Sequence, residues 1–165
     1  MNDWKIDAAG LALALELDRV PLREATDWPD AMILQQERPD YRLIELSLAR
    51  TVDVAVEHLN ALSAGVGPHD RVLAFFDRVL PLNDLEPQEA DGMIVYLTRV
   101  LDECEDDEAS NLSSCLSYHD DAIEMAVAGI YGSPTACVQQ FIEDITALVS
   151  EWRSNGRDHR KAFET

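Results

Sequence analysis

Apolar side chains recur at spacings of three and four residues along most of the chain, and this spacing restricts it to a helical fold. The clearest segment is residues 133–152, where Ser133 can cap a helix and Pro134 takes the first helical position, at which its missing N–H costs nothing. The apolar residues that follow fall on one face: Cys137, Val138, Phe141, Ile142, Ile145, Leu148, Val149 and Trp152. This pattern predicts an amphipathic helix.

Seven more segments show the same spacing, and prolines and glycines separate them. Thr51 can cap one of them, Pro81 ends another, and Gly132 is the expected C-cap of the segment before residue 133. The segments are residues 6–17, 21–36, 40–50, 52–63, 68–80, 86–104 and 112–130. We therefore predict an all-α fold, a single-domain bundle of about seven or eight mostly antiparallel helices with no sheet.

Residues 6–17 are the one segment in which a strand period competes with a helical one. Four leucines alternate there with other residues: Leu11, Leu13, Leu15 and Leu17. The intervening residues are two alanines and a glutamate, and the run contains no β-branched side chain, so propensity favours a helix. In a helix these leucines occupy opposite faces, which predicts burial on two sides.

Length and composition predict one helical domain over residues 1–153 and a polar C-terminal tail over residues 154–165. The three cysteines are odd in number and irregularly spaced, which does not suggest a disulfide framework. The N-terminus lacks the basic and apolar regions of a signal peptide, and no apolar stretch is long enough for a bilayer. We therefore expect a cytoplasmic protein.

The charge of the chain is strongly and unevenly negative. It carries 32 acidic residues against 13 Lys and Arg, for a net charge of −19, and residues 100–152 contain no Lys or Arg at all. Such a field repels phosphate and anionic lipid and attracts basic surfaces. It predicts no direct nucleic-acid binding, no membrane association and a basic protein partner, although the acidity could also serve solubility alone.

Acidic residues are most concentrated in residues 102–124, where we place the candidate partner-binding site. Its members are Asp102, Glu103, Glu105, Asp106, Asp107, Glu108, Asp120, Asp121 and Glu124. The first six do not match a calcium loop, which needs alternate oxygen ligands around a central glycine and a closing glutamate. The alternative is a solvated loop whose acids face the positive end of the next helix dipole.

Motifs for catalysis, cofactors and metals are absent from the sequence. Cys115 and His119 stand four apart, a spacing that metal sites use, and Cys104 and Cys137 lie on neighbouring apolar stripes. The C-x-x-C pairs of structural zinc sites are missing, so we predict no metal ligand and leave open whether this pair is core. No nucleophile elbow or phosphate-binding loop is present, which predicts no catalytic residue, no cofactor and no enzymatic activity.

Two N-terminal segments carry a resemblance to a known class of proteins. They are residues 25–33, ATDWPDAMI, and residues 38–49, RPDYRLIELSLA. Together they resemble small helical bacterial proteins of polymorphic toxin systems, including domains proposed as immunity proteins. The resemblance implies a cytoplasmic, acidic, non-enzymatic protein specific for one toxin, and it transfers no binding residue.

Charge and resemblance together favour an immunity or antitoxin-like protein that occludes a basic toxin domain, a nuclease being one such domain. A helical adaptor or regulatory module with another protein partner is the alternative, and a metal-dependent enzyme built on acidic side chains is the third class. The sequence leaves the oligomeric state open.

Overall fold

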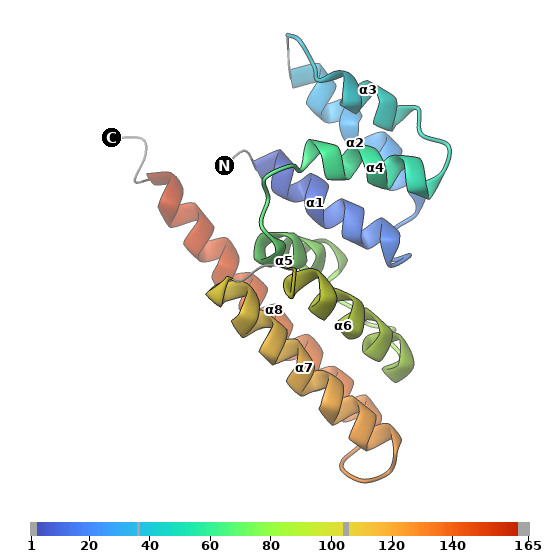
Figure 1. Ribbon diagram of the computed structural model, residues 1–165, viewed down its shortest axis with the longest axis vertical. Coiled ribbons are helices and arrows are strands. Elements are labelled where there is room, and N and C mark those ends of the chain that lie inside the picture. The colour runs from blue at the N-terminus through green and yellow to red at the C-terminus, as the bar shows by residue number, and fades with distance from the viewer. Residues whose placement is uncertain (1–2, 36, 104–105, 162–165) are drawn as a thin grey trace. The chain divides into compact units, whose positions relative to one another are not determined.

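The computed structural model describes residues 3–35, 37–103 and 106–161. These residues form eight α-helices and no strand (Figure 1), which confirms the predicted all-α fold. Where one helical domain was expected, the contacts divide the chain into two compact units, unit 1 (Met1–Val79) and unit 2 (Leu80–Thr165). None of the described helices combines the length and the apolar character that crossing a membrane requires.

Unit 1 is built around its first helix. Its helices are α1 (Asp3–Glu16), α2 (Leu22–Gln35), α3 (Tyr41–Ser47), α4 (Val52–Leu62) and α5 (Pro68–Val79). Helix α1 packs against both α4 and α5, so the prediction that it is buried on two sides is confirmed. One face joins a core with residues of α2, α3 and α4: Ala8, Leu11, Ala12, Leu15, Ala25, Leu43, Leu46, Ala55, Leu59 and Leu62.

The opposite face of α1 meets α5 at very close range. A Cβ atom at Gly10 would lie 2.6 Å from the carbonyl carbon of Ala74 and 2.9 Å from its Cβ. Only a residue without a side chain allows two helix backbones to approach this closely. Gly10 therefore sets the separation of α1 and α5.

Helix caps in unit 1 form through side chains that stand directly before the helices. The Thr51 side chain accepts a hydrogen bond from the backbone N–H of Val54, so the predicted cap of α4 is confirmed. Asp40 caps α3 in the same way through the N–H of Arg42. Helix α2 continues through Pro29, and the Arg78 guanidinium binds the Glu24 carboxylate at 2.8 Å, which ties α5 to α2.

Unit 2 consists of three longer helices: α6 (Pro87–Leu101), α7 (Asp107–Val127) and α8 (Pro134–Lys161). Helix α7 packs against both α6 and α8 (Figure 1). The largest fully buried side chains of the unit are Ile94, Leu97, Leu101, Leu116, Ile123 and Phe141. The predicted start of α8 at Pro134 is confirmed.

The end of α7 differs from the prediction. The helix stops at Val127, and Gly129, with a φ of 72°, takes the left-handed position that we had assigned to Gly132. The N–H of Ile130 donates to the carbonyl of Met125 at 2.9 Å, and the N–H of Gly129 donates to that of Ala126 at 3.0 Å. This is the Schellman pattern, which closes the helix at the first glycine available.

Helix α8 extends to Lys161, past residue 153, so the first residues of the predicted polar tail are helical. Once a helix has formed, each further residue adds a hydrogen bond without the penalty of nucleation. The Ser154 hydroxyl donates to the carbonyl of Ser150 at 2.9 Å at the start of this extension. Of the predicted tail, residues 162–165 lie outside the described part of the chain.

Candidate functional site

The predicted acidic residues between α6 and α7 have exposed side chains, and several of them support the ends of these helices. We call the described ones, Asp102, Glu103, Asp106, Asp107 and Glu108, the acidic turn; Glu105 lies outside the described residues. Asp102 accepts a hydrogen bond from the Ser113 hydroxyl at 2.9 Å, and Asp106 caps α7 through the N–H of Glu108. Asp107 and Glu108 occupy the first turn of α7, where the helix dipole favours negative charge.

The remaining predicted residues lie at the other end of the same helix. From Asp106 to Asp120 the helix rises by about 20 Å, at 1.5 Å per residue. The eight described residues of the prediction therefore form two acidic clusters, one in the acidic turn and one near the end of α7, where the sequence suggested one surface.

The second cluster gains a member that the sequence analysis missed. Asp120, Asp121 and Glu124 of α7 are joined by Asp91 of α6, which shares a side-chain hydrogen bond with Asp120. Burial, the hydrogen bond with Asp91 and the neighbouring negative charges together raise the pKa of Asp120 to about 6. Two ionised carboxylates cannot share a hydrogen bond, so the pair holds a proton below this pH.

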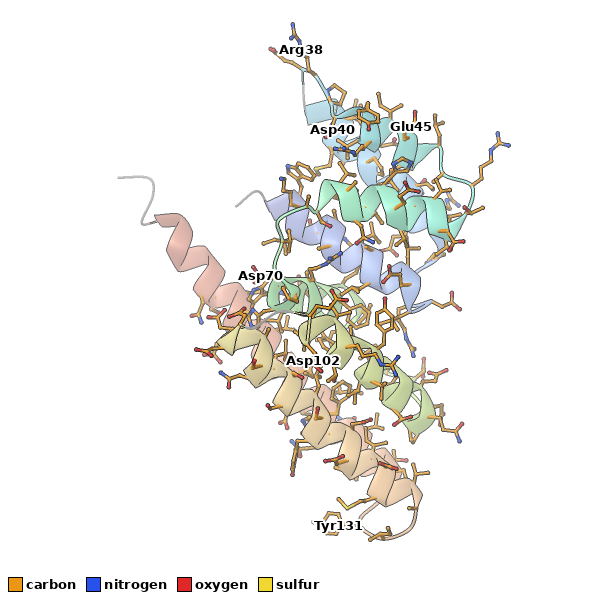
Figure 2. The ribbon with its side chains drawn as sticks, in the orientation of Figure 1. Arg38, Asp40, Glu45, Asp70, Asp102 and Tyr131 are labelled. Carbon is orange, nitrogen blue, oxygen red and sulfur yellow. The ribbon has the colours of Figure 1, made fainter. Side chains whose placement is uncertain are left out.

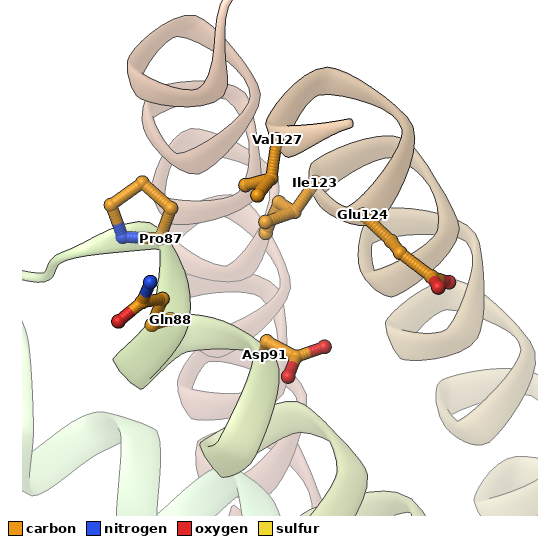
Figure 3. A pocket seen from close by; sticks show the side chains of 6 residues that line it. All are labelled: Pro87, Gln88, Asp91, Ile123, Glu124 and Val127. Atoms are coloured by element: carbon orange, nitrogen blue, oxygen red, sulfur yellow. The ribbon is translucent and has the colours of Figure 1, made fainter. Parts of the chain in front are cut away.

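A groove between α6 and α7 adjoins this cluster (Figure 3). Its volume is about 170 Å³, which is smaller than the pockets that bind small molecules. Residues of α6 form one wall and residues of α7 the other: Pro87, Gln88, Asp91, Ile123, Glu124 and Val127. We call it the acidic groove, because an apolar floor lies beside two carboxylates.

An exposed apolar cluster lies where α7 ends, and we call Met125, Val127, Ile130 and Tyr131 the hairpin tip. The exposed fraction is 54% for Val127, 74% for Ile130 and 70% for Tyr131. Figure 2 shows Tyr131 at the turn that joins α7 to α8. Val127 and Ile130 belong to segment 112–130, whose apolar spacing predicts a helix with one buried face, yet both side chains are exposed at the point where α7 ends.

Unit 1 carries a second exposed apolar stripe, formed by Tyr41 and Ile44 of α3 and by Leu48, the residue that follows this helix. Charges of both signs surround it. The Arg42 guanidinium lies 5.3 Å from the centre of the Tyr41 ring and 3.8 Å from the Asp40 carboxylate. The stripe therefore has no electrostatic preference that would identify a partner.

Cys115 and His119 belong to the packing between α7 and α8. His119 is buried, its ring meets that of Phe141 edge-on at 5.5 Å, and its Nε2 donates to Asp144 at 3.2 Å. Burial raises the pKa of the Cys115 thiol, and the charge of Asp144 acts in the same direction, so this thiol is not an activated nucleophile. Within the described ranges, no group of three or more His, Cys, Asp or Glu is placed to hold a metal ion. Cys104 lies outside those ranges.

Replacing Asp120 with asparagine should stabilise unit 2 at neutral pH. The folded pKa of about 6 exceeds the ordinary value of 3.8, so the folded state loses stability as the pH rises through that window. Each unit of difference between the folded and the ordinary pKa corresponds to about 1.4 kcal/mol. Solvent screening at this partly exposed site reduces that energy, so we expect Asp120→Asn to raise the free energy of unfolding by about 1 kcal/mol at pH 7.5. Chemical denaturation at several pH values measures it.

The gain should shrink as the pH falls from 7.5 to 5, because Asp120 then takes up its proton and resembles the amide. Asp121→Asn removes the same charge from an exposed neighbour and serves as the comparison; it should give a smaller gain, because the Asp121 charge is only a lesser cause of the raised pKa of Asp120. Equal stability of the parent chain and Asp120→Asn at pH 7.5 would show that the carboxyl pair is not under repulsion.

Searches of protein-family models, of curated proteins and of solved structures find no match to this chain.

Proposed function

We propose that the protein is a non-enzymatic binding protein that covers a basic protein domain with the acidic groove of unit 2, as an immunity protein covers its toxin. The observation that carries the proposal is the gathering of Asp91, Asp120, Asp121 and Glu124 on two adjacent helices. Residues 79–98 and 100–152 contain no Lys or Arg, so α7 and the first twelve residues of α6 supply no lysine or arginine of their own.

The raised pKa of Asp120 supports a cationic partner in particular. Burial contributes most to this shift and repulsion from the neighbouring carboxylates adds to it, and taking up a proton relieves that repulsion. A Lys or Arg side chain would relieve it at neutral pH without a proton. The same negative field would speed the encounter with a basic domain and would occupy the surface on which a nuclease holds phosphates.

A second candidate, a helical adaptor with more than one partner, is favoured by the exposed stripe of Tyr41, Ile44 and Leu48 on unit 1. Exposed apolar clusters of this kind often mark protein contacts. In that case the two units would bind different proteins, and removing the charge of unit 2 would leave binding through α3 intact.

Neutralising two acids at the groove should slow association with the partner. We expect Asp121→Asn/Glu124→Gln to lower the association rate about tenfold at low salt, with little change in the dissociation rate. Raising the salt concentration from about 20 mM to about 500 mM should lower the association rate of the parent chain and bring it close to that of the variant. Surface plasmon resonance with basic domains encoded at the same locus measures both rates.

The control removes the same charge from unit 1. Glu45→Gln/Glu57→Gln changes two exposed acids of α3 and α4 and should leave the association rate nearly unchanged. If the parent chain associates at a rate that salt does not alter, the electrostatic proposal is wrong. If both double variants slow association equally, net charge matters and the groove does not.

A further inference from the structure

We infer that the partner presents an apolar side chain beside its basic one, and that the hairpin tip holds this apolar side chain while the acidic groove receives the Lys or Arg. The inference rests on the proposed function and adds to it the chemistry of the bound segment: basic and amphipathic. In this arrangement the carboxylates speed association with the partner, and the hairpin tip slows its dissociation.

The first observation is the exposure of the tip. Ile130 and Tyr131 are each at least 70% exposed, and Val127 is half-exposed beside them. A folded chain gains nothing by leaving three adjacent large apolar side chains in water, whereas an interface gains most from such groups. Tyrosine in particular supplies a large contact area with few rotatable bonds and a hydroxyl that stays wet.

The second observation is that the tip is held in place before any partner arrives. The carbonyl of Met125 accepts from the N–H of Ile130 at 2.9 Å and from that of Tyr131 at 3.4 Å. Gly129 and Gly132, with φ values of 72° and 69°, bracket the turn and let the chain reverse into α8. A preformed turn loses less conformational entropy on binding than a flexible loop would.

The third observation is that the tip and the acidic groove are continuous. Val127 belongs to both, and Glu124 lies one helical turn before Ala128, at which α7 is capped. Pro87, Ile123 and Val127 give the groove an apolar floor on which the methylene stem of a Lys or Arg could lie. Asp91 and Glu124 also line the groove, and their carboxylates would bind the charged head group (Figure 3).

Charge complementarity identifies the occupant. The groove is too small for a typical small-molecule ligand, but it can receive one side chain. The acids around it would repel an acidic segment and an anionic membrane, and a second copy of this chain would bring the same negative charges into contact. A basic amphipathic protein segment satisfies both the apolar tip and the carboxylates.

Two synthetic helical peptides of equal charge test the inference with the full chain. One carries lysines on one face and leucines on the other, and the second carries the same lysines with every leucine replaced by glutamine. We expect the Lys/Leu peptide to dissociate about tenfold more slowly than the Lys/Gln peptide, with similar association rates. Ile130→Ser/Tyr131→Ser should abolish this difference by speeding the release of the Lys/Leu peptide.

The matched control places the same substitutions on the other exposed stripe. Tyr41→Ser/Ile44→Ser changes an equally exposed aromatic and a neighbouring aliphatic side chain on unit 1 and should leave both dissociation rates unchanged. Both double variants change only exposed side chains, and circular dichroism verifies that each remains folded.

The outcomes separate the two proposals. If Ile130→Ser/Tyr131→Ser releases the Lys/Leu peptide at the parent rate, the inference about the tip is overturned while the electrostatic proposal stands. If neither peptide shows salt-dependent association, the proposed function falls and the inference falls with it. A salt-insensitive dimer of the chain that disappears in Ile130→Ser/Tyr131→Ser would overturn the inference by making a second copy the occupant.

Discussion

Gly10→Ala should lower the free energy of unfolding of unit 1 by about 2 kcal/mol. The new methyl group would lie 2.6 Å from the carbonyl carbon and oxygen of Ala74, and backbone atoms cannot rotate away as a side chain does. Helices α1 and α5 would have to separate, and both lose packing against a close-packed core. Overpacking of this kind costs about 1–3 kcal/mol, which exceeds the gain of up to about 1 kcal/mol from helix propensity.

Gly92→Ala is the matched control, since Gly92 is also inside a helix but has open space around it. The same change there should raise the free energy of unfolding by up to about 1 kcal/mol. Urea denaturation gives the two values, and hydrogen exchange locates each effect in its unit. A stabilising Gly10→Ala would mean that α1 and α5 are farther apart than the structure places them.

The second large effect concerns His119. His119→Ala should lower the free energy of unfolding of unit 2 by about 3 kcal/mol, because it removes a buried ring from between α7 and α8 and leaves a cavity against Phe141. His119→Phe keeps an aromatic ring there and should retain most of the stability. Tyr118→Ala is the comparison: its exposed ring meets that of His119 edge-on at 5.4 Å, but its removal leaves no buried cavity and should cost much less.

The pH dependence of the free energy of unfolding is a second test of whether His119 is a core residue. Burial lowers the pKa of His119 below its ordinary value of 6.5, while Asp144 acts in the opposite direction. As the pH falls below 6.5, the unfolded state takes up the proton first, so the folded state loses stability. His119→Phe should lose less stability than the parent chain between pH 7 and pH 5. If His119→Phe unfolds as readily as His119→Ala, the packing role of the ring is wrong.

Much of the secondary structure follows from local signals. Ser133 with Pro134, and Thr51 before Val52, mark helix starts that are confirmed, because a cap depends only on residues within one turn. The end of α7 was assigned to the wrong glycine. Gly129 and Gly132 both suit a left-handed position, and only the closing hydrogen bonds to Met125 and Ala126 decide between them.

The candidate site was predictable in part. Asp121 and Glu124 share one face of a helix at a spacing of three, so the sequence alone could group them. Asp91 stands 29 residues before Asp120, and nothing in its neighbourhood marks it among so many acids. Its contact with Asp120 depends on the register in which α6 lies against α7.

The amino-acid sequence alone predicts that the chain is helical, where most of its helices begin, and that residues 100–152 carry negative charge without Lys or Arg to balance it. Helix formation depends mainly on residues a few positions apart, and net charge depends on composition, so both can be predicted without a structure. The division into two units, the crowding of Asp91 with Asp120, and the exposure of Ile130 and Tyr131 become visible in the folded chain and not before. These features depend on how residues far apart in the chain pack, and packing is decided by the fit of whole helix faces rather than by spacing along one helix.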